Sequence, residues 1–176
     1  PQEVFIQNFY NRHRHSEMCL DPSGTRLIMA IQRDDTHGEK DLYVSSKRSD
    51  GSFTEPQNIH SINTFGNEMS PFVAADGKTM YFATDGRKGY GNVDIWMTRR
   101  LDDTWLQWSE PENLGPFINT SGWDAYFTVP ASGDYAYMSA TGTSGSADIH
   151  RVRLTAGVKP GPVVLVRGRV LDASTK

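Results

Sequence analysis

An internal repeat of 53 to 54 residues, short runs of alternating apolar residues, and turn signals between those runs together predict an all-β fold. About three copies of the repeat are visible, and each reads as four short antiparallel strands. Four-stranded sheets that recur at this period are typical of the blades of a β-propeller. A β-sandwich is the competing fold, but it gives no reason for one motif to return in every copy.

Four landmarks define the repeat. The first is Gly-x-x-Asp followed by an aliphatic residue, the second is a turn glycine before a hydrophobic strand, and the third is an acidic residue before the first strand of each copy. In that order the landmark residues are Gly38, Asp41, Gly91, Asp94, Gly145 and Asp148, then Gly24, Gly77 and Gly133, then Glu17, Glu68 and Asp124. The fourth is Glu-Pro-x-Asn-aliphatic with a following Ile-Asn-Thr, at 55–64 and 110–120. A shared period predicts three equivalent sheets.

The phase of the repeat predicts the domain organisation. Residues 1–4 match the register of the fourth landmark, so we expect an orphan last strand of an earlier blade there, and strands near 68–74, 78–84, 93–99 and 108–114 in the middle copy. Propellers need at least about four blades to close, so a larger ring is expected. Residues 1–158 are predicted as a partial propeller. Residues 159–176 are predicted as a linker and the first strand of another β-domain, because alternation restarts there without any landmark.

Composition and charge exclude several classes of protein. The chain is 37% hydrophobic and 22% charged, which is typical of soluble globular proteins, and no apolar run has the length of a membrane helix. The net charge is −3 and the basic residues are scattered, so nucleic-acid binding is disfavoured. A single cysteine, Cys19, excludes an intrachain disulfide and leaves the cellular compartment open.

The middle copy carries a resemblance to a known family. Ser70–Pro71–Phe72, Asp76–Ala83 and Gly91–Trp96 resemble the PD40 (WD40-like) repeat, a family that includes the propeller of the translocation protein TolB. With Trp108–Gly115 and Ile118–Thr120 the pattern is similar to the version in OmpA-family envelope proteins of Bacteroidetes. The resemblance covers roughly residues 1–155. The first and third copies depart from it, because Ser23 and Ser132 replace the Asp of Asp-Gly and the third copy lacks a clear Trp-Ser-x-Pro strand.

The resemblance implies a location and a role. In such proteins a PD40 propeller is often followed by a carboxypeptidase-regulatory-like sandwich, whose first strand residues 166–175 resemble, and then by a peptidoglycan-binding OmpA domain. It therefore implies a periplasmic, outer-membrane-associated module that binds other cell-envelope proteins, with peptidoglycan bound only by a domain outside this chain. Some members of the group are components of the type IX secretion system. The alternative is a propeller that accompanies a hydrolase acting on peptides or glycans.

The repeated acids have two interpretations. Asp41, Asp94 and Asp148 could be ligands or catalysts, but their return at one point in each copy favours a structural role, in which a short carboxylate accepts backbone N–H bonds at a strand entry. The same reasoning applies to Glu17, Glu68 and Asp124. We expect no catalytic residue, no metal site and no cofactor, since the sequence has no Gly-x-Ser-x-Gly, phosphate loop or His-Glu-x-x-His.

Histidines and tryptophans supply the remaining candidates. His13 and His15 could share one face of a strand and bind zinc, but no third ligand is identifiable, so a polar loop is the simpler interpretation. Trp105 and Trp123 vary more than the landmarks, and Arg99 and Arg100 lie near them in sequence. Exposed aromatic residues on blade loops often anchor partners, so these four residues are the candidate partner-binding residues, although core packing is the favoured interpretation of the tryptophans.

Overall fold

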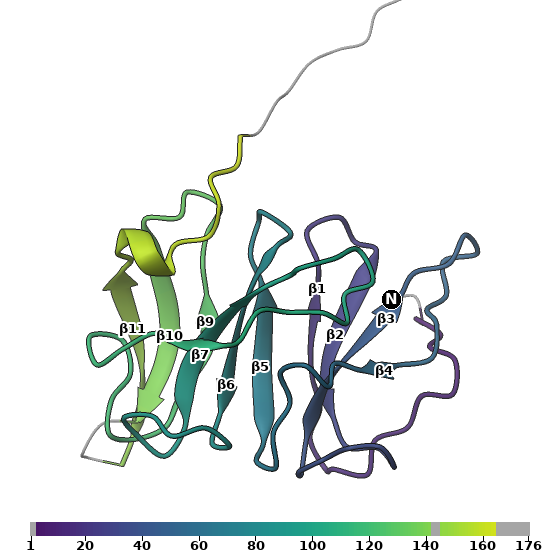
Figure 1. The fold of residues 1–176 in the computed structure, drawn as a ribbon, viewed down its shortest axis with the longest axis horizontal. Coiled ribbons are helices and arrows are strands. Elements are labelled where there is room, and N and C mark those ends of the chain that lie inside the picture. The colour runs from purple at the N-terminus through teal and green to yellow at the C-terminus, as the bar shows by residue number, and fades with distance from the viewer. Residues whose placement is uncertain (1–2, 142–144, 165–176) are drawn as a thin grey trace, which may run out of the picture.

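The computed structural model describes residues 3–141 and 145–164, which form three antiparallel sheets side by side (Figure 1). Blade 1 contains β1 (Glu17–Leu20), β2 (Arg26–Ile31), β3 (Asp41–Ser46) and β4 (Gln57–Asn58). Blade 2 contains β5 (Glu68–Val73), β6 (Thr79–Thr84), β7 (Asp94–Arg99) and β8 (Glu112–Asn113). Blade 3 contains β9 (Asp124–Thr128), β10 (Tyr135–Thr141) and β11 (Ala147–Arg153), followed by a 3-10 helix, η1 (Ala156–Val158). Within these residues no helix has the length and apolar character needed to cross a membrane.

The sheets stack face to face, and apolar residues at equivalent positions fill both junctions. Between blades 1 and 2, Ile28 and Leu42 share a buried cluster with Phe82. Between blades 2 and 3, Tyr81 packs against Phe127 with ring centroids 4.9 Å apart. The first strands of successive blades also contact one another, β1 with β5 and β5 with β9. This stacking of repeated meander sheets confirms the predicted fold class, an all-β fold of propeller blades.

Blade 2 has the four predicted strands. Three of them begin and end within one residue of the expected ranges, while the fourth shrinks from 108–114 to Glu112–Asn113. Its upstream part contributes a single bridge between Arg100 and Trp108. The outermost strand is short because residues 101–107 form a loop rather than a continuous ladder.

Blade 3 departs from the prediction of four strands, because three are present in the described part of the chain. After β11 the chain enters η1 and then a segment with Pro160 and Pro162, which have no N–H to donate to a ladder. The predicted linker residues are held in place, because Gly161 N donates to Asp76 and Tyr81 donates to the Val158 carbonyl, both at 2.7 Å. The predicted strand of a following domain, residues 166–175, lies outside the described residues.

The predicted orphan strand near the N-terminus is wrong for the residues that can be described. Residues 3–5 form no strand, and Ile6 makes a single parallel bridge with Phe53. Two hydrogen bonds flank that bridge, from Phe53 N to the Phe5 carbonyl at 2.8 Å and from Gln7 N to the Phe53 carbonyl at 3.1 Å. The chain turns at residues 49–51, just before Phe53, so no longer ladder forms there.

The first hairpin of each blade needs a glycine. Gly24, Gly77 and Gly133 have φ of 69°, 63° and 71°, in the left-handed region that only glycine enters without strain. In blade 2 the turn is further fixed by Asp76, which accepts hydrogen bonds from the backbone of Lys78 (3.0 Å) and Thr79 (2.9 Å). Burial raises the pKa of Asp76, but these hydrogen bonds outweigh it and hold the pKa below its ordinary value.

Blade 1 uses a different carboxylate for the same purpose. Ser23 stands where blade 2 has Asp76, and Asp21 accepts backbone hydrogen bonds from Ser23, Thr25 and Arg26 at 2.6–3.0 Å. Asp21 was not among the predicted landmarks, because it lies two residues before the aligned position.

We predict that Asp76→Ala lowers the free energy of unfolding by about 1 kcal/mol at about pH 7, since a half-exposed carboxylate is partly screened by solvent. The folded-state pKa lies below the unfolded value of about 3.9, so this contribution is present above that value and disappears as the pH falls through the folded pKa. Urea unfolding at several pH values should show the difference between the two proteins shrinking as the pH falls below about 3.9. A difference independent of pH would contradict this account.

Candidate functional site

In blade 2 the aspartate of the Gly-x-x-Asp motif is buried at the start of the third strand, and both of its carboxylate oxygens accept hydrogen bonds. Asp94 is 2% exposed. One carboxylate oxygen accepts hydrogen bonds from Tyr90 N (2.6 Å) and Asn113 Nδ2 (2.7 Å), and the other accepts from Gly91 N (2.9 Å). The carboxylate therefore fixes the loop before β7 and ties it to β8.

The same contacts continue into the next blade through the Asn-Thr pair of the fourth landmark. Asn119 Nδ2 donates to Asn113 Oδ1 (2.9 Å), and Asn119 forms two further hydrogen bonds with the backbone N–H and carbonyl of Ile95 (2.8 and 3.0 Å). The next residue, Thr120, donates from its backbone N–H to Asp124 at the start of β9 (2.7 Å). One chain of hydrogen bonds thus joins blade 2 to blade 3.

Blade 1 is joined to blade 2 by equivalent residues. Asn58 donates to Asp41 at 2.7 Å, and Asn63 donates to Asn58 at 2.8 Å. Thr64 then donates to Glu68 from its hydroxyl (2.6 Å) and its backbone N–H (3.1 Å). Asp41 and Glu68 are both fully buried. One oxygen of Asp41, Oδ1, has no hydrogen-bond partner, unlike the matching oxygen of Asp94.

We call each of these sets of contacts a carboxylate clasp. A clasp runs from the aspartate of the third strand through two asparagines and a threonine to the acid at the start of the next blade. Burial raises the pKa of Glu68, and the hydrogen bonds from Thr64 and Thr84 oppose that shift. Burial likewise raises the pKa of Asp124. Since these carboxylates are enclosed and bonded to the blades, they support the structural interpretation of the landmarks.

Two landmark acids are placed differently. Glu17, the first-strand acid of blade 1, pairs with buried Lys40 at 3.3 Å and accepts a hydrogen bond from Ser70 N of blade 2 at 2.6 Å. Asp148 is exposed at the start of β11. Its structural interpretation finds no support in the described contacts.

The glycines of the Gly-x-x-Asp motif also differ between the blades, with those of blades 1 and 2 in close contacts and that of blade 3 in a turn. A Cβ at Gly38 would lie 1.9 Å from the Gly66 carbonyl oxygen, and one at Gly91 would lie 2.5 Å from the Thr120 carbonyl oxygen. Both glycines therefore allow the linker to the next blade to approach closely. Gly145 has a φ of 77° and no heavy atom near its Cβ position, so a turn rather than a close neighbour requires it.

Trp105 is a core residue, which corrects its assignment as a partner-binding candidate. It is 6% exposed and lies in the cluster between blades 1 and 2, next to Trp108, whose indole N–H donates to the Trp105 carbonyl at 2.8 Å. The Arg100 guanidinium lies 4.9 Å from the Trp105 ring centroid. Arg100 thus covers a buried indole and is not an isolated surface charge.

Trp123 and Arg99 lie at opposite ends of the blades. Trp123 is half-buried before β9, where it forms a bridge with Val93, the residue just before β7. Arg99 ends β7 and donates to Thr79 (3.0 Å) and to the Lys159 carbonyl (3.4 Å). The structure therefore does not bring the four candidates together into one site.

A different set of aromatic residues is exposed. Loops 32–40, 59–67 and 85–93 lie at the lower edge of Figure 1, and loop 114–123 projects on the left and runs down to the same edge before β9. We call the surface of these four loops the linker face. Phe65, Tyr90 and Phe117 on this face are 90%, 54% and 98% exposed. Sequence reasoning missed them because it favoured tryptophan. The available signal was a Phe or Tyr within two positions of a glycine in three of the four loops.

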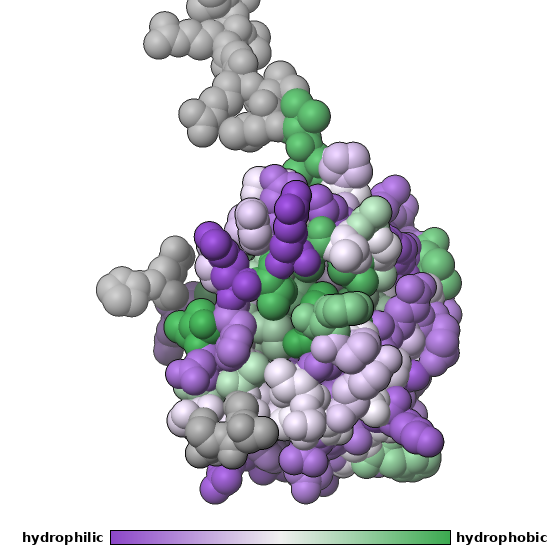
Figure 2. Space-filling model, turned by 90° about the vertical axis from the view of Figure 1, so that its left-hand side faces the viewer, coloured by the Kyte–Doolittle hydropathy of each residue, from purple (hydrophilic) through white to green (hydrophobic). Residues whose placement is uncertain are grey.

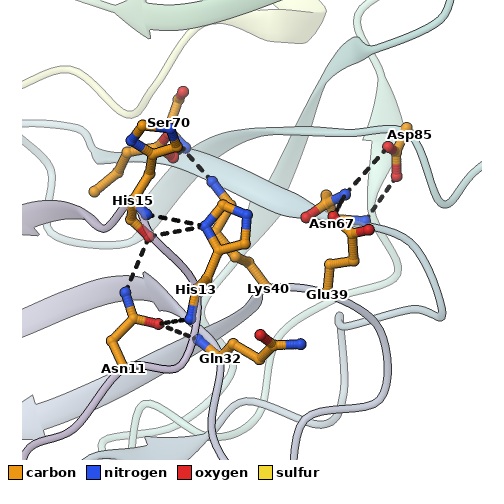
Figure 3. A network of polar contacts seen from close by, with 10 residues as sticks. Asn11, His13, His15, Gln32, Glu39, Lys40, Asn67, Ser70 and Asp85 are labelled. Carbon is orange, nitrogen blue, oxygen red and sulfur yellow. Dashed lines mark hydrogen bonds and ion pairs between the residues drawn. The ribbon is translucent and has the colours of Figure 1, made fainter.

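A polar network borders the linker face (Figure 3). Asn67 donates to Glu39 (3.0 Å) and its backbone N–H donates to Asp85 (2.7 Å), so loops from blades 1 and 2 are joined. His15 N donates to the His13 ring nitrogen Nδ1 (3.1 Å), which places the pair in a local turn. Among the described residues no three His, Cys, Asp or Glu side chains gather as a metal site would require.

The outer flank of blade 1 is apolar. A cavity of about 1160 Å³ is lined there by residues that include Val4, Phe5, Phe9, Met18 and Leu20, all of which are substantially exposed. The equivalent flank of blade 2 is covered by blade 1, so this surface matches one that the repeat elsewhere buries against a neighbouring sheet.

The fold and these surfaces define the chain as a section of a β-propeller. No protein-family model matches the chain, and no curated protein gives a significant match. Among solved structures it is similar to a mutant of puromycin hydrolase in complex with PGG, with a TM-score of 0.43 and 15% identity. That match covers 81% of this chain and 27% of the hydrolase chain, so the chain spans about a quarter of that protein. Similarity at this level does not carry an activity from one protein to another.

We predict that Asp94→Ala lowers the free energy of unfolding by about 3 kcal/mol, because it leaves the Asn113 amide without its charged acceptor. Asp148→Ala is the matched control. It removes the same landmark from an exposed position and should change stability by no more than about 0.5 kcal/mol. Urea unfolding of the two variants makes the comparison, and equal losses would refute the assignment of Asp94 to the clasp.

Proposed function

We propose that this chain belongs to a non-catalytic propeller that binds other proteins. The observation that carries the proposal is the use of the conspicuous carboxylates as scaffold. Asp41, Asp94, Glu68 and Asp124 are each at most 2% exposed and are bonded within or between blades, so they are not presented to a substrate. General acid or base catalysis needs such a group within reach of the reacting atoms.

The linker face supports a binding role. Its loops are locked by the clasps and by glycines at close approaches, so Phe65 and Phe117 are held exposed on a rigid frame. Large aromatic side chains at a preorganised surface are the residues that most often dominate protein–protein affinity. We assign the partner-binding surface to this face.

The resemblance of residues 1–155 to PD40 repeats supports a more specific location. On that basis we place the protein in the periplasm, associated with the outer membrane, as an OmpA-family protein whose partners are other envelope proteins and a candidate component of the type IX secretion system. Peptidoglycan contact would belong to a domain outside this chain. The competing role is a propeller that accompanies a hydrolase.

We predict that Phe65→Ala lowers the yield of partner cross-linked from position 117 at least about tenfold without lowering the melting temperature, since the Phe65 side chain is exposed. The measurement uses the full-length protein in its native cells, with the photo-crosslinker p-benzoyl-phenylalanine at position 117 and identification of cross-linked peptides by mass spectrometry. Repeated recovery of one envelope protein is expected.

The same full-length protein can be used to test the competing role, a propeller that accompanies a hydrolase. A fluorophosphonate probe, which labels active serine hydrolases, should leave the full-length protein unlabelled. Specific labelling, or the absence of any cross-linked protein, would contradict the proposed function.

A further inference from the structure

An aromatic cluster stands on the linker face at the junction of blades 1 and 2. His37, in the loop before β3, lies next to His60, in the linker after β4, with ring centroids 5.1 Å apart, and next to Phe65 at 6.1 Å. All three side chains are exposed, Phe65 to 90%. We call these three residues the histidine–phenylalanine patch. Contiguous rings left in water mark a surface that a ligand or partner covers.

The position of the patch distinguishes it from a surface that a neighbouring blade covers. The loops that carry it join blades 1 and 2, and both of these blades are present. The open face of blade 3, where Figure 2 shows apolar side chains among hydrophilic ones, is of the kind that blades 1 and 2 bury between sheets. A further blade of a ring would cover that face but would leave the patch exposed.

The segment that follows blade 3 also lies away from the patch. Residues 155–164 run along the end of the blades opposite the linker face (Figure 1). There Gly161 N donates to Asp76 in the first hairpin turn of blade 2 at 2.7 Å. Polypeptide beyond residue 164 therefore starts at the far end of the blades, which favours a separate protein over a following domain as the occupant of the patch.

The patch is not part of the scaffold that the blades share. The same three repeat positions in blade 2 hold Tyr90, Gly115 and Ser121. Blade 2 forms the same four-stranded sheet and the same kind of linker without the two histidines and the phenylalanine. Since the fold does not require these side chains, their exposed cluster is better explained by binding.

The backbone beneath the patch is closely packed. A Cβ at Gly38 would lie 1.9 Å from the Gly66 carbonyl oxygen, and a Cβ at Gly66 would lie 2.4 Å from the Cα atom of Gly86. The three loops therefore meet through bare backbone, and the rings project from a frame that is fixed before any partner arrives. Such preorganisation lowers the entropic cost of binding.

Two carboxylates beside the patch identify the kind of partner. Glu39 N donates to the carbonyl of Gly66 (3.2 Å), and a Cβ at Gly66 would lie 2.4 Å from the Asp85 carboxylate, so both acids adjoin the residue after Phe65. Both carboxylates accept hydrogen bonds from Asn67 (Figure 3), Glu39 at 3.0 Å and Asp85 at 2.7 Å. Neither forms an ion pair within the described residues.

The basic residues of the same loops leave this negative charge largely uncompensated. Those that pair with acids are Arg33, Lys40 and Arg87. Among the residues that the structure describes in loops 32–40, 59–67 and 85–93, the charged side chains without an ion pair are Asp35, Glu39, Asp85 and Lys88. Aromatic faces attract cations, and carboxylates form strong charge-assisted hydrogen bonds with them. The surface therefore complements a basic side chain.

We propose that the histidine–phenylalanine patch docks a separate protein through a lysine or arginine of that protein. The cation lies over the exposed rings and pairs with the carboxylates of Glu39 and Asp85. This inference rests on the proposed binding function and specifies the chemistry of the partner at the linker face.

The test places p-benzoyl-phenylalanine at position 65 of the full-length protein in its native cells and maps the cross-linked peptides. We expect a peptide of another polypeptide with Lys or Arg near the linked position. Glu39→Gln combined with Asp85→Asn should lower the cross-link yield about tenfold or more, because two charge-assisted contacts are lost. The melting temperature should not fall, since both acids are exposed.

Two further variants make the result specific. Glu112→Gln removes the same charge from an exposed position on β8 and should leave the yield unchanged. Glu39→Lys should lower the yield as the double variant does, and exchange of the mapped basic residue of the partner for glutamate should restore it.

The inference would be overturned by a cross-link from position 65 to the same chain, by a linked peptide without a basic residue nearby, or by a yield that the double variant does not change. The cross-linker at position 117 distinguishes the two proposals. If position 117 captures a protein and position 65 shows no charge-dependent capture, the linker-face function stands and the inferred partner chemistry fails. If neither position captures a protein, the proposed function fails as well.

Discussion

The carboxylate clasp is the contact on which the rest of the structure depends. Each blade is a meander whose strands form ladders with one another, and the backbone contacts between the described blades are short, such as the bridge between Val93 and Trp123. The strand ladders therefore do little to set the position of the next blade. Asp94 fixes the loop before β7, the asparagines carry that constraint across β8, and Thr120 delivers it to Asp124 of blade 3. Because the aspartates are buried with their acceptor oxygens largely occupied, the constraint is worth more than the same contacts would be in water.

The clasp also explains what the sequence allowed us to predict. A contact that every blade needs equally returns at a fixed spacing, so Asp41, Asp94, Glu68 and Asp124 stood out in the sequence as repeat elements before their contacts were known. The turn glycines were recognisable for the same reason, since each hairpin requires a positive φ. Three strands of blade 2 were predicted within one residue because their alternation is uninterrupted.

The rest depended on contacts between residues far apart in the chain. Trp105 looked like a loop tryptophan, yet the loop folds back and buries it between blades 1 and 2. In blade 1, Asp21 fixes the first hairpin turn as Asp76 does in blade 2. It lies two residues before the position that aligns with Asp76, so comparison of the repeats did not reveal it. The exposure of Met18 and Leu20 on the outer flank of blade 1 depends on which surfaces a neighbouring sheet covers. Local sequence patterns do not contain that information.

The most direct measurement of the central claim is a double-mutant cycle between Asp94 and Asn113 in the free energy of unfolding. If the carboxylate acts through the clasp, Asp94→Ala and Asn113→Ala should be strongly non-additive, with a coupling of about 1–3 kcal/mol. A pair that adds within about 0.5 kcal/mol would contradict the account, because the aspartate would then stabilise its own loop independently of β8 and of the clasp that continues from it.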